Sequence, residues 1–130
     1  MRFARPCYDH LTGRLAVGIA DRLVEEGAVR IEEETAVVTD RAGPVLAGLG
    51  LSLDTLQMPT RGARPPCRPC LDWGERRMHL AGRLGALLCT HSLESGWLLR
   101  QRQSRTLTLT PEGARAWRDW LGVARWQALA

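Results

Sequence analysis

Two stretches of this chain repeat apolar residues at helical spacing. The first predicts a helix over residues 8–26 with one buried face, formed by Leu11, Leu15, Ile19 and Leu23. The second predicts a helix that begins near Glu75, with its apolar face at Leu80, Leu84, Leu87, Leu88 and Leu93. Gly27 follows the first stretch as Gly96 follows the second, and glycine commonly stands just beyond a helix C-terminus.

A β-hairpin and a shorter helix are predicted after the first long helix. Val29 and Ile31 precede an acidic turn at 32–34, and the apolar residues 36–38 follow it, a pattern typical of two short paired strands. Thr39 can cap the helix that follows, which we expect to end near Leu49.

The same order of elements is predicted after the second long helix. Residues 97–99 and 106–109 are expected to pair as strands around a polar tip at 101–105. Thr110 followed by Pro111 indicates a helix start, with threonine as the cap and proline at the first helical position. This last helix has an apolar face at Trp117, Trp120, Leu121 and Ala124.

The two halves also share a motif, His-Leu-x-Gly-Arg-Leu, at residues 10–15 and again at 79–84. A connector rich in proline and glycine, residues 50–69, separates the two copies. We therefore predict an α+β fold made of two tandem helix–hairpin–helix repeats, at 1–49 and 70–130, packed as one pseudo-symmetric domain.

Composition and charge narrow the class of protein. Hydrophobic residues make up 45% of the chain, yet no apolar run reaches about 18 residues, and the first 25 residues lack the shape of a secretory signal. We expect a globular cytoplasmic protein with reduced cysteines and no membrane contact. Residues 1–64 carry 8 Arg and 9 acidic residues (−1), whereas residues 65–130 carry 10 Arg and 5 acidic residues (+5). Only the second half is therefore suited to a polyanion.

Two groups of residues carry a resemblance to known regulators. Residues 96–113, with Gly-Trp-Leu before and Leu-Thr-Leu-Thr-Pro-Glu-Gly after the polar tip, resemble the helix, wing and final helix of bacterial winged-helix transcription regulators. Residues 7–15 and 70–85 more closely resemble the C-terminal region of a subgroup of ArsR-type regulators. The resemblance covers about residues 5–122, and each unit is then winged-helix-like.

This resemblance implies a role in transcription regulation, with DNA bound through an N-terminal winged helix-turn-helix domain that is absent from this chain. A DNA-reading unit needs a short helix, a tight turn and a recognition helix, whereas each unit here offers one long predicted helix before its hairpin. The chain then corresponds to the effector-sensing or dimerisation half of the regulator, as a truncation or as a stand-alone relative. The competing hypothesis is an autonomous metal- or thiol-redox-binding module with no DNA role.

Cysteine and histidine recur at similar places in the two copies. Cys7 and His10 stand in the first copy, and Cys70 and His79 in the second. If the copies pack about a pseudo-two-fold axis, these four side chains can converge on zinc, which takes two thiolates and two imidazoles in a tetrahedron. An alternative ligand set combines the Cys67/Cys70 CxxC pair with Cys7 and His10. Buried structural cysteines and capping histidines are the simpler interpretation.

Two other site hypotheses rest on charged or oxidisable side chains. Cys67 and Cys70 are close enough for reversible oxidation, which a neighbouring arginine would assist. Arg14 and Arg83 occupy equivalent positions and can bind a small anionic effector between the units. We favour the alternative that each arginine pairs with the aspartate two residues after the cysteine of its copy, Asp9 or Asp72.

The second hairpin and the terminal aromatic residues complete the candidates. The second hairpin carries Arg100, Arg102 and Arg105, which resemble a wing that touches DNA phosphates. A solvated tip is the simpler interpretation. The terminal tryptophan-rich helix is expected in the core, with a homodimer contact as a second use. No nucleophile, base and acid stand at a recognisable spacing and no glycine-rich phosphate loop occurs, so we do not expect an enzyme.

Overall fold

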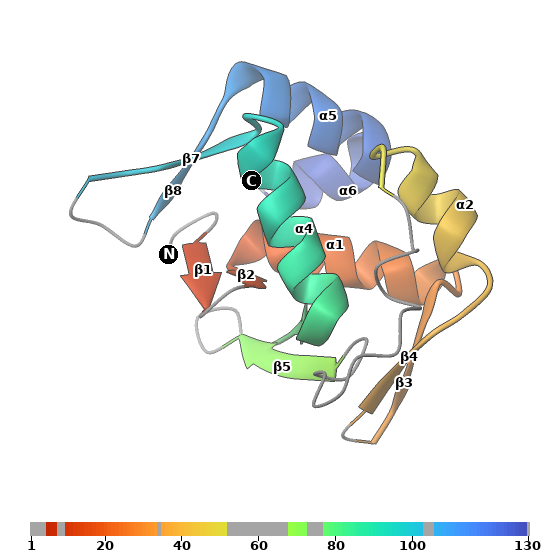
Figure 1. Cartoon of the computed structure of the whole chain (residues 1–130). Helices are drawn as coiled ribbons and strands as arrows, with labels where there is room; N and C mark the ends of the chain where they lie inside the picture. The colour runs from red at the N-terminus through yellow and green to blue at the C-terminus, as the bar shows by residue number, and fades with distance from the viewer. Residues whose placement is uncertain are drawn as a thin grey trace.

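The computed structural model of the chain describes residues 5–7, 10–33, 35–51, 68–72, 77–102 and 106–129. The fold is α+β, with helices and small antiparallel hairpins (Figure 1). The first half contains β1 (Arg5–Cys7), β2 (His10–Thr12), α1 (Arg14–Glu25), β3 (Val29–Glu32), β4 (Thr35–Val38) and α2 (Ala42–Ala47). The second half contains β5 (Arg68–Asp72), β6 (Arg77–Ala81), α4 (Gly82–Glu94), β7 (Leu98–Arg100), β8 (Leu107–Leu109), α5 (Pro111–Leu121) and α6 (Val123–Ala128).

Each half begins with a hairpin that the sequence pattern did not predict. The expected helix over 8–26 starts only at Arg14, and the one expected from Glu75 starts only at Gly82. The residues before them form β2 and β6 instead. Leucines four apart fit a strand followed by a helix as well as one continuous helix. The change occurs at glycines with positive φ, Gly13 (98°) and Gly82 (77°), a conformation that other residues rarely adopt.

The predicted hairpins and second helices are confirmed. β3 pairs with β4 and β7 with β8, both antiparallel. Thr110 caps α5 by accepting a hydrogen bond from the Gly113 amide at 3.0 Å, with proline at the start of the helix. At its far end, Gly122 (φ 87°) separates α5 from the additional helix α6. Each half therefore has the order hairpin, helix, hairpin, helix.

Equivalent threonines make the same hydrogen bonds in the two halves. Thr39 Oγ1 donates to the carbonyls of Gly27 at 2.5 Å and of Ala28 at 3.2 Å. Thr110 Oγ1 donates to the carbonyls of Gly96 at 2.7 Å and of Trp97 at 3.2 Å. Both glycines have positive φ, 76° and 73°, and turn the chain from the long helix into the strand. The halves therefore share local geometry as well as element order.

The halves exchange contacts across the centre of the molecule. Helix α1 packs against β6 of the second half, α4 packs against β2 of the first half, and β2 also contacts β6. Figure 1 shows α4 crossing in front of α1 at the centre of the fold. One hydrophobic core therefore joins both halves, and its large, fully buried apolar side chains are Leu15, Leu23, Leu46, Leu84, Leu98, Trp117 and Leu121.

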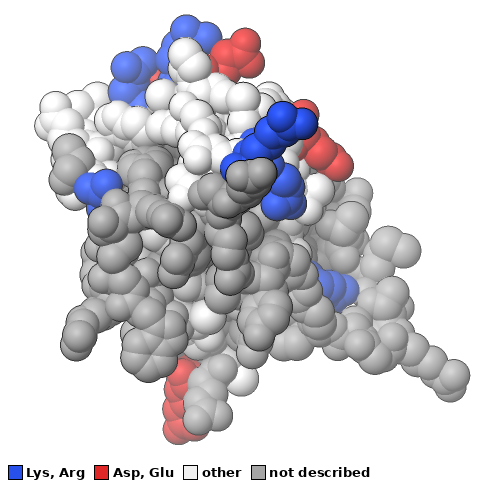
Figure 2. Space-filling view, turned by 90° about the vertical axis from the view of Figure 1, so that its left-hand side faces the viewer, with Lys and Arg blue, Asp and Glu red and all other residues white. Residues whose placement is uncertain are grey.

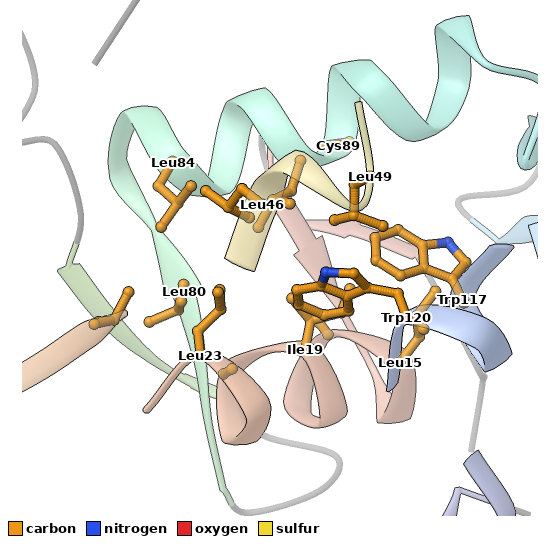
Figure 3. Close-up of a cluster of buried hydrophobic side chains, with 14 of the residues drawn as sticks. Leu15, Ile19, Leu23, Leu46, Leu49, Leu80, Leu84, Cys89, Trp117 and Trp120 are labelled. Carbon is orange, nitrogen blue, oxygen red and sulfur yellow. The ribbon is translucent and has the colours of Figure 1, made fainter. Parts of the chain in front are cut away.

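The core lies between the two long helices and is closed by α5 (Figure 3). Trp117 and Trp120 are buried there, as their spacing predicted, and their ring centroids lie 5.8 Å apart in an edge-to-face arrangement. Trp120 Nε1 donates to the Val45 carbonyl at 2.8 Å, which joins α5 to α2 of the other half. Within the described ranges, no helix is long and apolar enough to cross a membrane.

Candidate functional site

The cysteine and histidine of each copy are direct partners across a hairpin. Cys7 stands opposite His10 in the register of β1 and β2, and Cys70 stands opposite His79 in the register of β5 and β6. The unequal sequence separations, two intervening residues in one pair and eight in the other, conceal this equivalence. The sequence placed His10 and His79 on helices, whereas both stand on strands just before a helix begins.

The second of these pairs is described in side-chain detail. His79 is 1% exposed, and Cys70 is half-buried and not part of a disulfide. The side chains of Cys7 and His10, and the whole of Cys67, lie outside the described residues. In the part that is described, no three His, Cys, Asp or Glu side chains are grouped as a metal site. The zinc and thiol-redox hypotheses, which need side chains beyond that part, remain predictions.

Arg14 and Arg83 occupy matching places at the starts of the two long helices. Both side chains are half-buried, and the Nε atom of each is shielded from solvent. Asp9 and the side chain of Asp72, their proposed partners, lie outside the described residues. Anion binding by the two arginines and pairing with these aspartates therefore both stay predictions.

The basic tip of the second hairpin is exposed where it is described. Arg100 and Arg102 are both exposed, and Arg105 lies outside the described residues. The β7–β8 hairpin projects on the left of Figure 1, and the face that Figure 2 turns toward the viewer carries described arginines in separate groups. Such a tip can contact phosphates. Its described residues supply two positive charges, those of Arg100 and Arg102, which do not make a broad basic surface.

An apolar groove that the sequence analysis missed lies between α1, β3 and β6. Its volume is about 390 Å³, and Val24, Ile31 and Met78 line it with exposures of 42%, 39% and 42%. Asp21 and Glu25 also border it. The available signal was Met78, which stands beside the buried His79 in a strand and therefore points to the opposite face. Large apolar side chains gathered at a surface are typical of a contact site.

A second feature that the sequence analysis missed connects α1 with α5. Arg22 of α1 donates from Nη1 to the main-chain carbonyl of Trp120 and stacks over that indole, with the guanidinium carbon 4.4 Å from the ring centroid. Burial lowers the pKa of Arg22; the charge of Glu26 raises it, and that of Arg125 lowers it. Arg125 itself pairs with Glu25, which joins α6 to α1.

Comparison with known proteins finds a relative that is described as a transcriptional regulator. The uncharacterized HTH-type transcriptional regulator YdfF of Bacillus subtilis (strain 168) is 37% identical to this chain over 123 residues. This chain is similar to a transcriptional regulator. The alignment covers 95% of the chain but only 53% of the regulator, so the chain spans about half the length of that relative. No family model and no solved structure matches the chain.

Proposed function

We propose that this chain is the effector-sensing and dimerisation half of an ArsR-like bacterial transcription regulator that acts in the cytoplasm. The observation that carries the proposal is the coverage of the alignment: nearly the whole chain matches about half of an HTH-type regulator. Such a protein needs a DNA-reading unit and a unit that controls it. The proposal assigns the second task to this chain and gives it no enzymatic activity.

The order of elements supports this division of labour. In each half, a long helix of 12 or 13 residues leads through a glycine turn into a hairpin and a second helix, which is the order of the last part of a winged-helix unit. A recognition helix would have to follow another helix across a tight turn. Within the described residues, α1 and α4 are each preceded by a strand and not by a helix. DNA reading therefore falls to the other half of the regulator.

The apolar groove supports the dimerisation part of the proposal. Val24, Ile31 and Met78 expose apolar surface from three elements around one hollow, and burial against a second copy would remove that surface from water. We assign the dimer contact to this groove. A dimer in turn suits regulators that read paired half-sites on DNA.

Light scattering after size exclusion tests the dimer. The chain is expected to elute as a dimer at tens of micromolar, and Val24→Glu and Met78→Glu are each expected to shift it toward the monomer. Val123→Glu is the matched control, because Val123 is 62% exposed on α6 and does not line the groove. A monomeric wild-type chain at all concentrations would overturn the dimerisation role, and a dimer indifferent to both groove variants would overturn the assigned contact.

Binding of duplex DNA at physiological salt tests whether DNA reading lies in the other half of the regulator. The chain alone is expected to form no sequence-specific complex with operator DNA, whereas a regulator that joins this chain to a helix-turn-helix half is expected to form one. A nanomolar, sequence-specific complex of the chain alone would contradict the proposal. If the joined protein also failed to bind DNA, the competing hypothesis of an autonomous metal- or thiol-binding module would be favoured.

A further inference from the structure

We propose that the groove between α1, β3 and β6 binds a lipophilic organic cation, which competes there with the second copy of the chain. This inference rests on the function proposed above and deepens it, because it names a class of effector and the way in which its binding would act. It is carried by the size of the groove, its apolar walls and the two carboxylates at its border.

The groove has the size and lining of a small-molecule site. Its volume of about 390 Å³ lies within the range of roughly 300–1,000 Å³ that is typical of such sites. Three of the five large hydrophobic side chains that are exposed in the described part of the chain line it, namely Val24, Ile31 and Met78. Methionine is unbranched and flexible, so this wall can adapt to the outline of a ligand. An apolar molecule in the groove would remove these side chains from water.

The charge at the border of the groove selects a cation. Asp21 and Glu25 stand four residues apart on α1 and therefore one turn apart on the same face, beside the wall formed by Ala20 and Val24. None of the described residues that line the groove is cationic. Arg125 binds the Oε2 atom of Glu25, yet the Glu25 side chain is still 62% exposed. A cation in the groove would therefore have two carboxylates as neighbours, and an anion would be repelled.

The second half lacks this combination at the equivalent place. A shift of 69 residues, from 10–15 to 79–84, aligns the two copies of the repeated motif, and it places Thr90 at the position of Asp21 and Arg100 at the position of Ile31. The second half thus has a neutral residue in place of the carboxylate and a positive charge in place of the apolar strand residue. We therefore expect one cation per chain and not two.

One groove cannot hold a cation and a second copy of the chain at the same time. The dimer contact proposed above buries Val24 and Met78, which are also walls of the cation site. Binding of the cation would thus release the dimer, and dimerisation would weaken cation binding by the same factor. A regulator that reads paired half-sites would then lose affinity for DNA when the cation is bound.

Titration with tetraphenylphosphonium and tetraphenylborate tests the site, because the two ions have nearly the same size and shape and opposite charge. Calorimetry of the full chain in sodium buffer, at low micromolar concentration, should show one tetraphenylphosphonium per chain with a micromolar Kd. Tetraphenylborate should bind about tenfold more weakly. The chain has a net charge of +4, so non-specific attraction favours the anion. Equal binding of the two ions, or tighter binding of tetraphenylborate, would overturn the proposal.

Substitutions locate the bound cation. Asp21→Asn should weaken tetraphenylphosphonium binding about fivefold, because it removes a charge and keeps the shape of the side chain. Met78→Ala should weaken it about threefold through lost apolar contact. Glu94→Gln and Leu99→Ala are the controls: Glu94 stands on α4 at the position of Glu25, Leu99 is 51% exposed, and neither lines the groove. Circular dichroism checks that each variant has folded, and controls as damaging as the groove variants would overturn the site.

Light scattering in the presence of each ion tests the competition. Saturating tetraphenylphosphonium should shift the mass of the wild-type chain toward the monomer, whereas tetraphenylborate should leave the dimer intact. A dimer that persists when the cation is bound would overturn the shared groove. A chain that is monomeric at all concentrations would overturn the dimerisation role and with it the competition, whereas the titration decides cation binding independently.

Discussion

Arg22 and His91 occupy equivalent positions in the two halves, and each binds a main-chain carbonyl of the opposite half. Both stand twelve residues after the repeated histidine on the long helix. Arg22 donates to the carbonyl of Trp120, and His91 Nε2 donates to the carbonyl of Leu49 at 2.6 Å. These two acceptors are themselves equivalent, because each lies ten residues beyond the threonine that bonds the glycine turn of its half, Thr39 or Thr110. The long helix of each half thus contacts the other half at its second helix: Arg22 bonds within α5, and His91 bonds the turn that follows α2.

Replacing Arg22 with alanine should weaken this contact. The change removes a charged hydrogen bond to Trp120 and a cation–π contact with the same residue, so we expect a loss of about 2 kcal/mol in the free energy of unfolding. Arg30→Ala is the control, because Arg30 is exposed and only pairs with Glu32 at the surface; it should change stability by less than about 0.5 kcal/mol. Urea unfolding measures both, and equal effects would contradict the role assigned to Arg22.

The equivalent threonines allow a matched test of the two halves. Thr39→Val and Thr110→Val should each cost about 1 kcal/mol, because each removes a hydroxyl that bonds the carbonyls of the glycine turn. Thr110→Val should be the more costly, since that hydroxyl also caps α5. Serine at either position keeps the hydroxyl and should restore most of the stability. A destabilised serine variant would show that packing of the methyl group, and not the hydrogen bonds, is responsible.

Local chemistry explains which elements could be predicted from the sequence. The predicted start of α5 is confirmed, because Thr110 and Pro111 specify a helix N-terminus whatever surrounds them. The hairpins before the long helices were missed because Leu11 and Leu80 continue the spacing of the helical leucines behind them. Only the positive φ of the intervening glycines, which a residue name does not reveal, separates strand from helix.

The cysteine–histidine pairs were predicted only in part, because the sequence repeat shows local equivalence and not strand pairing. The repeat identified Cys7, His10, Cys70 and His79, but their pairing across the strands depends on a register that spacing alone does not fix. The contact of Arg22 with Trp120 and the groove around Met78 were missed because both arise where the halves pack together. Tertiary contacts of this kind leave no periodic signal in the sequence.

Gly113 should tolerate no side chain. A Cβ atom there would lie 2.1 Å from the carbonyl oxygen of Trp97, which the Thr110 amide holds in place at 3.0 Å. We expect Gly113→Ala to cost about 3 kcal/mol or more, because main chain must move to admit the methyl group. Gly122→Ala is the comparison: its site is open, but its φ of 87° and ψ of 156° form a combination that is essentially restricted to glycine, so backbone strain of about 1–3 kcal/mol applies and no clash. Thermal unfolding of the two variants should rank them in this order.

The tip of the second hairpin should account for what weak affinity the chain has for DNA. At low salt, we expect non-specific duplex binding in the micromolar range or weaker, and Arg100→Ala with Arg102→Ala should weaken it several-fold. Each phosphate contact contributes about 0.9 to the slope of log affinity against log salt, so the double variant should lower that slope by about 2. Fluorescence anisotropy across a salt series measures the slope.

Arg30→Ala on the first hairpin is the matched control for that measurement. Arg30 is an exposed arginine on an equivalent strand, but Glu32 accepts its hydrogen bond at 2.7 Å and the adjacent turn is acidic. Local negative charge should keep that hairpin away from phosphate. Removing the Arg30 side chain should therefore leave the slope of log affinity against log salt unchanged. If Arg30→Ala lowered the slope as much as the double variant, binding would follow net charge and the second hairpin would not be a phosphate contact.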